Sequence, residues 1–124
     1  MKLRIRGNSI RIRLGQTEVA RLADGQSVEQ ITEFSSQSAL RNIVEPTTEV
    51  HCVQATFDRG CVLIRLPLDK AKDWANSDRV GIEAEQAVAD QRLLKILIEK
   101  DFECLHSRVE SITDAYPNPR NVDE

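Results

Sequence analysis

An internal repeat is the feature of this sequence that most constrains its fold. Ile12-Arg13-Leu14 recurs as Ile64-Arg65-Leu66, an offset of 52 residues (from 12 to 64). The same offset aligns Leu3, Ile5 and Ile10 with Ala55, Phe57 and Val62, and Val28 with Val80. An offset of 54 aligns ALRNIVE (39–45) with LLKILIE (93–99). Such self-similarity indicates a duplicated unit, and we expect the two-residue insertion in the loop before the last strand, where insertions are tolerated.

The beginning of each repeat is predicted to be a β-hairpin. MKLRIR and SIRIRL alternate apolar and cationic residues with the period of a half-buried strand. Gly7-Asn8 between them suits a tight two-residue turn, because glycine adopts positive φ without steric cost. Closing the turn there pairs Arg4 with Arg11 and Ile5 with Ile10. One face is then apolar, and the other carries only cations: Lys2, Arg4, Arg6, Arg11 and Arg13.

The rest of each repeat is predicted to be a short helix followed by two strands. Apolar spacing predicts helices over 16–23 and over 67–75, the second starting at Pro67. The stretch from 79 to 100 has strong helix formers, but its counterpart in the first repeat resembles two strands, so we expect strands at 79–86 and 92–100. The expected fold is α+β: a duplicated ββαββ unit forming a mainly antiparallel, strongly curved or barrel-like sheet of about eight strands with two short helices.

One side of that sheet is expected to form the hydrophobic core. Its predicted members are Leu3, Ile5, Ile12, Val28, Phe57, Ile64, Val80 and Ile96. We expect a single domain over residues 1–105, made of repeats at 1–46 and 50–100. Residues 106–124 contain two prolines and lack apolar periodicity, which predicts a partly disordered C-terminal extension.

The amino-acid composition excludes several classes of binding partner for this protein. The 124 residues contain 17 Lys and Arg against 20 Asp and Glu, a net charge of −3, and only 4% aromatic residues. Nucleic-acid binding is therefore not expected, because it needs cations for the phosphates and rings for the bases. No apolar stretch is long enough for a signal peptide or a membrane span. Three cysteines in such a chain are typical of reduced thiols, and we expect a cytoplasmic protein.

The five cations of the first hairpin have two possible roles. Arginines on a rigid hairpin can bind phosphate or carboxylate groups through bidentate contacts. Alternatively, they form an ion-pair lattice with carboxylates on the same sheet surface, namely Glu29, Glu33, Glu83 and Glu85. The lattice is the simpler interpretation, since exposed ion pairs offset repulsion without implying a site. The second hairpin bears Gln54, Thr56, Asp58 and Arg65 on the equivalent face, so the two copies do not share this charge.

Two metal-dependent hypotheses are weaker. Alternating Glu83 and Glu85 supply oxygen ligands suited to Mg²⁺, as in enzymes that process triphosphates with arginines inside a β-rich tunnel, but the alternation is short. A zinc site would draw on His51, Cys52, Cys61, Cys104 and His106. Strand geometry separates Cys52 from Cys61 by about 20 Å. Cys104 and His106 alone do not make a structural site.

Three segments carry a resemblance to a known family. The pattern MKLRIRGNSIRIRL, with WANSDRVGI (74–82) and LIEKDFECL (97–105), resembles a family of small uncharacterised bacterial proteins. The resemblance spans most of residues 1–105 and implies a bacterial protein. It implies no activity, cofactor or catalytic residue.

The sequence as a whole favours a small binding protein. We expect a non-enzymatic protein, without cofactor, catalytic residue or metal, that acts in a complex or as a homo-oligomer. The alternative is a protein that binds or hydrolyses phosphate esters or polyphosphate on the basic face of the first hairpin. A small anionic ligand on Lys2, Arg4, Arg6, Arg11 and Arg13 is the site expected in that case.

Overall fold

The two halves of the chain have the same order of elements in the computed structural model, which describes residues 1–102. The first half contains β1 (Lys2–Arg6), β2 (Ser9–Leu14), α1 (Gln16–Ala23), β3 (Val28–Ser35) and β4 (Ser38–Thr47). The second contains β5 (Gln54–Asp58), β6 (Cys61–Pro67), α2 (Leu68–Ala75), β7 (Gly81–Ala89) and β8 (Arg92–Lys100). The fold is therefore α+β with a repeated ββαββ-like unit, as predicted. The prediction for residues 106–124 lies outside the described residues.

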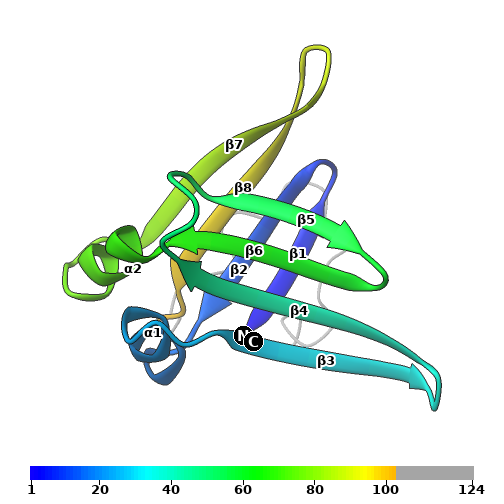
Figure 1. Ribbon diagram of the computed structural model, residues 1–124, viewed down its shortest axis with the longest axis horizontal. Helices are drawn as coiled ribbons and strands as arrows, with labels where there is room; N and C mark the ends of the chain where they lie inside the picture. Colours follow the sequence, from blue (N-terminus) through cyan, green and yellow to red (C-terminus); the bar gives the residue numbers. More distant parts are fainter. Residues whose placement is uncertain (103–124) are drawn as a thin grey trace, which may run out of the picture.

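The repeats exchange hairpins to build two four-stranded sheets. We call them sheet A, with strand order β1-β2-β8-β7, and sheet B, with order β3-β4-β6-β5. Each sheet thus joins the first hairpin of one repeat to the second hairpin of the other (Figure 1). The central pairs, β2 with β8 and β4 with β6, are parallel, and the outer pairs are antiparallel. The prediction of one mainly antiparallel, strongly curved or barrel-like sheet is wrong: both sheets are mixed, and neither closes.

The register of the sheets gives the true repeat alignment. Ile12 is paired with Ile98 in sheet A, and Ile64 with Val44 in sheet B, which confirms the offset of 54 for the last strands. Val28 lies opposite Val44, and Ile82 lies opposite Ile98. The counterpart of Val28 is therefore Ile82 and not Val80. The insertion falls between helix and third strand, in a surface connection, rather than before the last strand.

Local elements follow the sequence closely, with small boundary shifts. The first hairpin turns at Gly7-Asn8 with the predicted pairing, and Gly7 has a φ of 55°. The second turns at Arg59-Gly60. α1 matches its prediction, whereas α2 starts one residue later because Pro67 ends β6 and precedes the helix. β8 is as predicted, and β7 runs over 81–89 instead of 79–86.

The core lies between the sheets and under the helices. Its fully buried side chains come from both sheets and both helices, among them Ile12, Leu22, Ile64, Trp74 and Ile98. Of the eight predicted core residues, Ile12, Val28, Ile64 and Ile96 are buried, and Leu3 is half-buried. The prediction is wrong for Ile5, Phe57 and Val80, which are 60%, 70% and 51% exposed. The alternation of apolar and polar residues correctly identified the inward side of β1 and β5. Each sheet covers only part of the other, so an inward-facing residue near a hairpin turn remains exposed.

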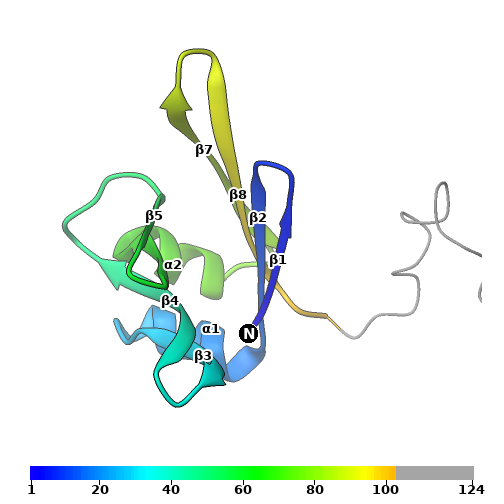
Figure 2. The same cartoon turned by 90° about the vertical axis from the view of Figure 1, so that its right-hand side faces the viewer.

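The two layers meet closely at one end and diverge at the other. α1 and α2 contact each other where β2 and β6 end, and the hairpin turns point away from this helical end (Figures 1 and 2). One edge of the layers is closed by Gln86 of β7. Its side-chain amide accepts a hydrogen bond from Ala55 N at 2.7 Å and donates one to Ala55 O at 2.8 Å. Within residues 1–102, neither helix has the length or apolar character to cross a membrane.

Candidate functional site

The outward face of sheet A carries the predicted cations together. Lys2, Arg4 and Arg6 alternate along β1 with inward residues, and Arg11 and Arg13 do the same on β2. Arg4 lies directly opposite Arg11, and Lys2 lies opposite Arg13. Like charges in opposed positions destabilise a sheet. The fold therefore requires carboxylates nearby, and their identity decides whether this face is an ion-pair lattice or a free cationic surface.

Glu99 of β8 binds two of the arginines. Arg11 Nε donates to Glu99 Oε1 at 2.6 Å, and Arg13 Nε donates to the same oxygen at 2.9 Å. Glu99 is only 8% exposed, although it is paired with Arg13 on the polar face of the sheet. A carboxylate that accepts two charge-assisted hydrogen bonds at such short distances holds both guanidinium groups in place.

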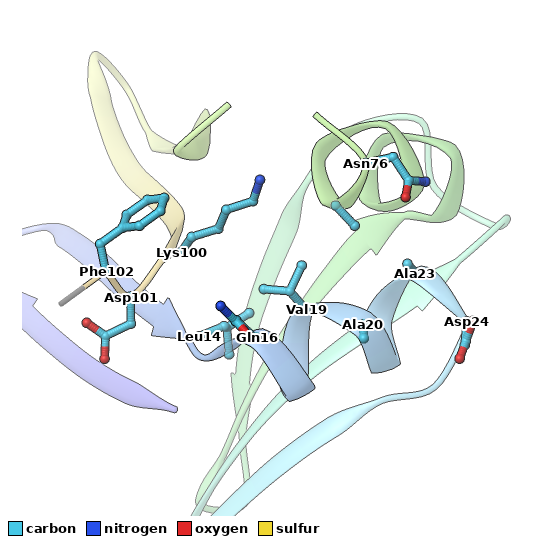
Figure 3. Close-up of a pocket in the computed structure, with 11 residues that line it drawn as sticks. Leu14, Gln16, Val19, Ala20, Ala23, Asp24, Asn76, Lys100, Asp101 and Phe102 are labelled. Carbon is cyan, nitrogen blue, oxygen red and sulfur yellow. The ribbon is translucent and has the colours of Figure 1, made fainter. Parts of the chain in front are cut away.

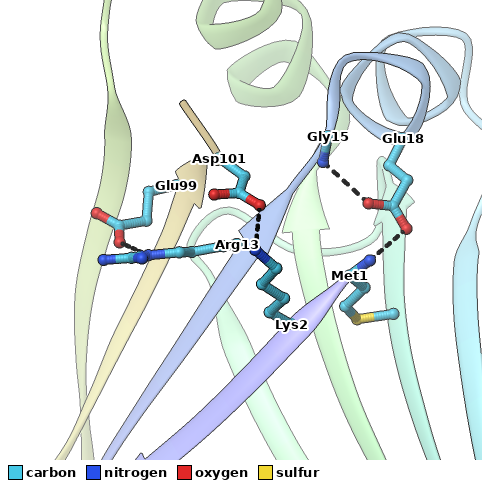
Figure 4. A network of polar contacts seen from close by, with 7 residues as sticks. All are labelled: Met1, Lys2, Arg13, Gly15, Glu18, Glu99 and Asp101. Carbon is cyan, nitrogen blue, oxygen red and sulfur yellow. Dashed lines mark hydrogen bonds and ion pairs between the residues drawn. The ribbon is translucent and has the colours of Figure 1, made fainter. Parts of the chain in front are cut away.

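A second carboxylate binds the start of β1 (Figure 4). Lys2 Nζ lies 3.0 Å from Asp101 Oδ2, just beyond the end of β8. The hydrogen bond from Lys2, with the positive charges of Lys2, Arg13 and the amino terminus, lowers the pKa of Asp101 below its ordinary value. Glu18 of α1 accepts a hydrogen bond from Gly15 N at 2.9 Å and one from the Met1 amino group at 2.9 Å. These contacts fix the start of β1 against the helical end.

Arg4 and Arg6 have no such partner. Both side chains are exposed, and neither makes an ion pair with any of residues 1–102. Among residues 1–102, the carboxylates of Glu99 and Asp101 thus pair with three of the five cations, namely Lys2, Arg11 and Arg13. The face keeps an excess of positive charge at the end of the hairpin near its turn.

A shallow hollow of about 780 Å³ extends from this face across sheet A. Its polar lining comes from Ser9 and Arg11 of β2, Lys95 of β8, and Glu83 and Glu85 of β7. Lys95 lies opposite Glu85 in the register, and Leu97 separates Arg11 from Glu83. The structure therefore brings Arg11 together with Glu83 and Glu85 around one hollow. Among residues 1–102, however, no group of three or more acidic, histidine or cysteine side chains is placed to hold a metal ion.

The ion-pair lattice predicted from the sequence used the wrong carboxylates. Glu29 belongs to sheet B, where it pairs with Arg41. Glu33 is on the same strand β3, far from the hairpin in register, and Glu83 and Glu85 form no ion pair within the described part of the chain. The error follows from topology, since the neighbour of β2 is β8 and not β3. Equivalent face residues of the second hairpin, Gln54, Thr56, Asp58 and Arg65, lie on sheet B.

The candidate zinc ligands are not brought together. Cys52 is exposed in the connection before β5, whereas Cys61 begins β6 at the other end of the hairpin, and both thiols are free. His51 is exposed. Cys104 and His106 lie outside the described residues. Residues 1–102 thus offer no zinc site from these side chains.

A second hollow, of about 720 Å³, lies at the helical end (Figure 3). Val19, Ala20 and Ala23 of α1 form one side, and Lys100 and Phe102 form another. Lys100 Nζ donates to Ser77 O at 2.7 Å and lies 5.7 Å from the centre of the Trp74 ring. The Lys100 ammonium group is therefore already bound within the fold, and the lining of the hollow mixes apolar with polar side chains.

Sequence reasoning missed Glu99, Asp101 and Lys95 as neighbours of the basic face. A signal for Glu99 was present: Arg13 aligns with Arg65 at offset 52, and Glu99 aligns with Glu45 at offset 54. The structure contains both pairs, Arg13 with Glu99 and Arg65 with Glu45. The recurrence of this Arg–Glu pair in both repeats indicates that the strand carrying the arginine lies beside the strand carrying the glutamate.

The fold and this face define a small duplicated α+β protein with a cationic sheet surface. The chain belongs to a family of unknown function (DUF7009), whose model matches residues 1–120. No curated protein and no solved structure matches the chain.

Proposed function

We propose that this chain is a non-enzymatic binding protein that takes a phosphate-bearing ligand on the outward face of sheet A. The observation that carries the proposal is the state of the hairpin cations. Arg4 and Arg6 are exposed and unpaired within residues 1–102, next to Arg11, which Glu99 fixes. If the cations of this face served only to form ion pairs within the fold, Arg4 and Arg6 would be expected to have carboxylate partners as well.

The chemistry of the face fits a polyanion. A guanidinium group presents several N–H donors in a planar fork that matches phosphate oxygens. Arg4 and Arg11 are opposed across the hairpin, and opposed side chains start about 4.5–5.5 Å apart at Cβ. Two such forks can therefore bind neighbouring phosphates of one ligand. The hairpin backbone is held by strand pairing on the β2 side, so little ordering cost accompanies binding.

A second candidate function is hydrolysis of a phosphate ester or polyphosphate. It is favoured by one observation: Glu83 and Glu85 line the same hollow as Arg11. Mg²⁺ is often bound by one or two carboxylates together with substrate phosphates, so two glutamates can suffice once a substrate is present. In that case the ligand is a substrate, and the same arginines bind it.

The decisive experiment compares two double variants in thermal melts with sulfate, pyrophosphate and triphosphate. We expect triphosphate to stabilise the wild type by about 2.7 kcal/mol at a hundredfold excess over Kd. The stabilisation should decrease with added salt, because the screening length falls to about 10 Å at 0.1 M. Arg4→Gln with Arg6→Gln should abolish it while the protein remains folded. Absence of any shift at low salt contradicts the proposal.

The control removes the same charge elsewhere. Arg79 and Arg92 are exposed and lie outside the basic face, so Arg79→Gln with Arg92→Gln should leave the triphosphate effect intact. Equal loss in both double variants would mean a nonspecific charge effect. Release of phosphate from triphosphate with Mg²⁺, lost in Glu83→Gln with Glu85→Gln, would favour the hydrolytic alternative over simple binding.

A further inference from the structure

The hollow at the helical end has a counterpart in the other half of the chain. The first hollow, of about 720 Å³, lies beside α1, and we call it the α1 hollow (Figure 3). A smaller one, of about 400 Å³, lies beside α2, and we call it the α2 hollow. Four residues that line the α1 hollow have equivalents that line the α2 hollow. The pairs are Gln16 with Leu68 and Ala20 with Lys72 at offset 52, and Asp101 with Thr47 and Phe102 with Thr48 at offset 54.

The chain that directly follows β4 forms part of the α2 hollow. Residues 48–53 connect the end of β4 to the start of β5. Within this connection, Val50 lines the α2 hollow and is only 8% exposed. Removing an apolar side chain from water in this way is favourable. One wall of the α2 hollow is therefore supplied by the segment that follows the neighbouring strand.

The equivalent segment beside the α1 hollow follows β8 and lies outside the described residues. At offset 54, Thr48-Glu49-Val50 aligns with Phe102-Glu103-Cys104, so the glutamate recurs and a cysteine stands in place of Val50. An unpaired cysteine behaves as a small hydrophobe and belongs to the residue types most often buried. The α1 hollow has nearly twice the volume of the α2 hollow, so it has room for this side chain.

The next aligned position changes polarity together with its hollow. His51 lines the α2 hollow, where Lys72 of α2 also contributes. In the other half these two positions are Leu105 and Ala20, which are both apolar. The segment after β8 therefore matches the α1 hollow in polarity, as the segment after β4 matches the α2 hollow.

The path of the chain leads to the α1 hollow. Asp101 N donates to Leu14 O at 2.9 Å, which continues the contact between β8 and β2 past the end of β8. Phe102 follows and lines the hollow. Two further residues span about 7 Å at most, so Cys104 is tethered within reach of the lining. A tethered segment also avoids the entropy cost of bringing two molecules together.

We propose that residues 103–105 dock in the α1 hollow, with the Cys104 side chain in the place that Val50 takes in the α2 hollow. The apolar wall formed by Val19, Ala20 and Ala23 is the surface that the segment covers. This inference is independent of the proposed anion site, because it uses no cation of the first hairpin. The occupant of the α1 hollow is the chain itself and not a separate ligand.

The first test measures how fast iodoacetamide alkylates each thiol of the native full chain, with mass spectrometry to identify the modified residue. Each rate is divided by the rate of the same thiol in urea, which removes differences in intrinsic reactivity. Cys52 is exposed and should react at nearly its urea rate. Cys104 should be slowed about tenfold or more, because a covered thiol reacts only when its segment opens.

Two results of this test overturn the proposal. One is a normalised rate for Cys104 equal to that of Cys52, which means that the segment does not cover the thiol. The other is protection of Cys104 that is lost on dilution, since it means that the segment docks on a second copy of the chain.

The second test changes the wall of the hollow. Ala20→Arg places a long cation in the α1 hollow and should raise the normalised alkylation rate of Cys104 toward that of Cys52. The control, Thr17→Arg, adds the same side chain at an exposed position of α1 that does not line the hollow, and it should leave Cys104 protected. The near-ultraviolet signal of buried Trp74 reports whether each variant remains folded. Equal rates in the two variants overturn the proposal.

The third test changes the docked residue. Cys104→Asp should lower the melting temperature by several degrees, because docking would bury a charge. Cys104→Val introduces the residue found at the equivalent position and should leave the melting temperature nearly unchanged. Cys52→Asp is the matched control at an exposed thiol and should have little effect. Equal melting temperatures for Cys104→Asp and Cys52→Asp overturn the proposal.

Discussion

The outward faces of the two sheets have the same arrangement of strands and differ in charge. Both contain the same ion pair between central parallel strands: Arg13 with Glu99 in sheet A and Arg65 with Glu45 in sheet B. In sheet B the remaining cation of the face, Arg41, is paired with Glu29. In sheet A the equivalent positions hold Lys95 and Glu83, which are not paired with each other, and the hairpin adds Lys2, Arg4, Arg6 and Arg11.

The hairpin of sheet B shows which charges of the first hairpin are absent from an equivalent hairpin. Sheet B forms the same hairpin with Thr56, Asp58 and Leu63 where sheet A has Arg4, Arg6 and Arg11. A hairpin of this kind thus forms without cations at these positions, whereas in sheet A the mutual repulsion of the hairpin cations is a cost that Glu99 and Asp101 offset only in part. Four predictions test how far the equivalence of the two halves extends, starting with the largest effect.

The helices should be equivalent in their contribution to stability. Trp74 and Leu22 occupy equivalent positions, and both are fully buried. Trp74→Ala should lower the free energy of unfolding by about 3–5 kcal/mol, and Leu22→Ala by about 2–5 kcal/mol, because each leaves a cavity in the shared core. Denaturant unfolding measures both. Ile31→Ala at an exposed position should cost about 0.5 kcal/mol or less, and similar losses in all three would show that the core is misplaced.

The equivalent ion pairs of the two sheets should contribute unequally to the free energy of unfolding. Glu99 accepts from two arginines at 2.6 and 2.9 Å, whereas Glu45 lies 3.7 Å from Arg65. Glu99→Gln should cost about 1.5–3 kcal/mol, the range for hydrogen bonds to charged groups, and Glu45→Gln less than about 1 kcal/mol. Chemical denaturation of the two variants gives the comparison directly. Equal losses would mean that Glu99 does not organise the basic face.

A third pair of equivalent residues tests the core of sheet B. Asn42 is 5% exposed and its Oδ1 has no hydrogen-bond partner within residues 1–102, whereas its equivalent in sheet A is buried Ile96. Asn42→Ile should stabilise the protein by about 1–3 kcal/mol, the cost of an unsatisfied buried acceptor. Ile96→Asn should destabilise it. A loss of stability in Asn42→Ile, measured by thermal melts, would indicate that Asn42 has a polar partner.

The smallest expected effect is on the stability of the protein at acidic pH. Asp101 has a lowered pKa because Lys2 donates to it, so it binds fewer protons in the folded than in the unfolded state. Its stabilising contribution is present above about pH 3.9, the ordinary pKa of aspartate, and is lost as pH falls through the lower folded value. Asp101→Asn should flatten this part of the stability curve. The equivalent residue in sheet B is Thr47, and Thr47→Val should leave the pH dependence unchanged.

Much of the local structure was predictable because it depends on residues close in sequence. Gly7 supplies the positive φ of the first turn, and period-two alternation then fixes which residues are opposed, so the pairing of Arg4 with Arg11 follows from the chain alone. Helix α1 and strand β8 follow from their own apolar spacing and from the repeat. The gathering of five cations on one face required no tertiary information.

Tertiary structure decided which strands are neighbours. Alternation specifies the two faces of β2 but not the strand beside it, and parallel pairing with β8 joins residues more than eighty positions apart, such as Arg13 and Glu99. That exchange of hairpins produces two mixed sheets, gives Arg11 and Arg13 their carboxylate, and leaves Arg4 and Arg6 without one among residues 1–102. It also limits how far one sheet covers the other. For this reason Ile12 is buried while Ile5, on the same side of the same hairpin, is exposed.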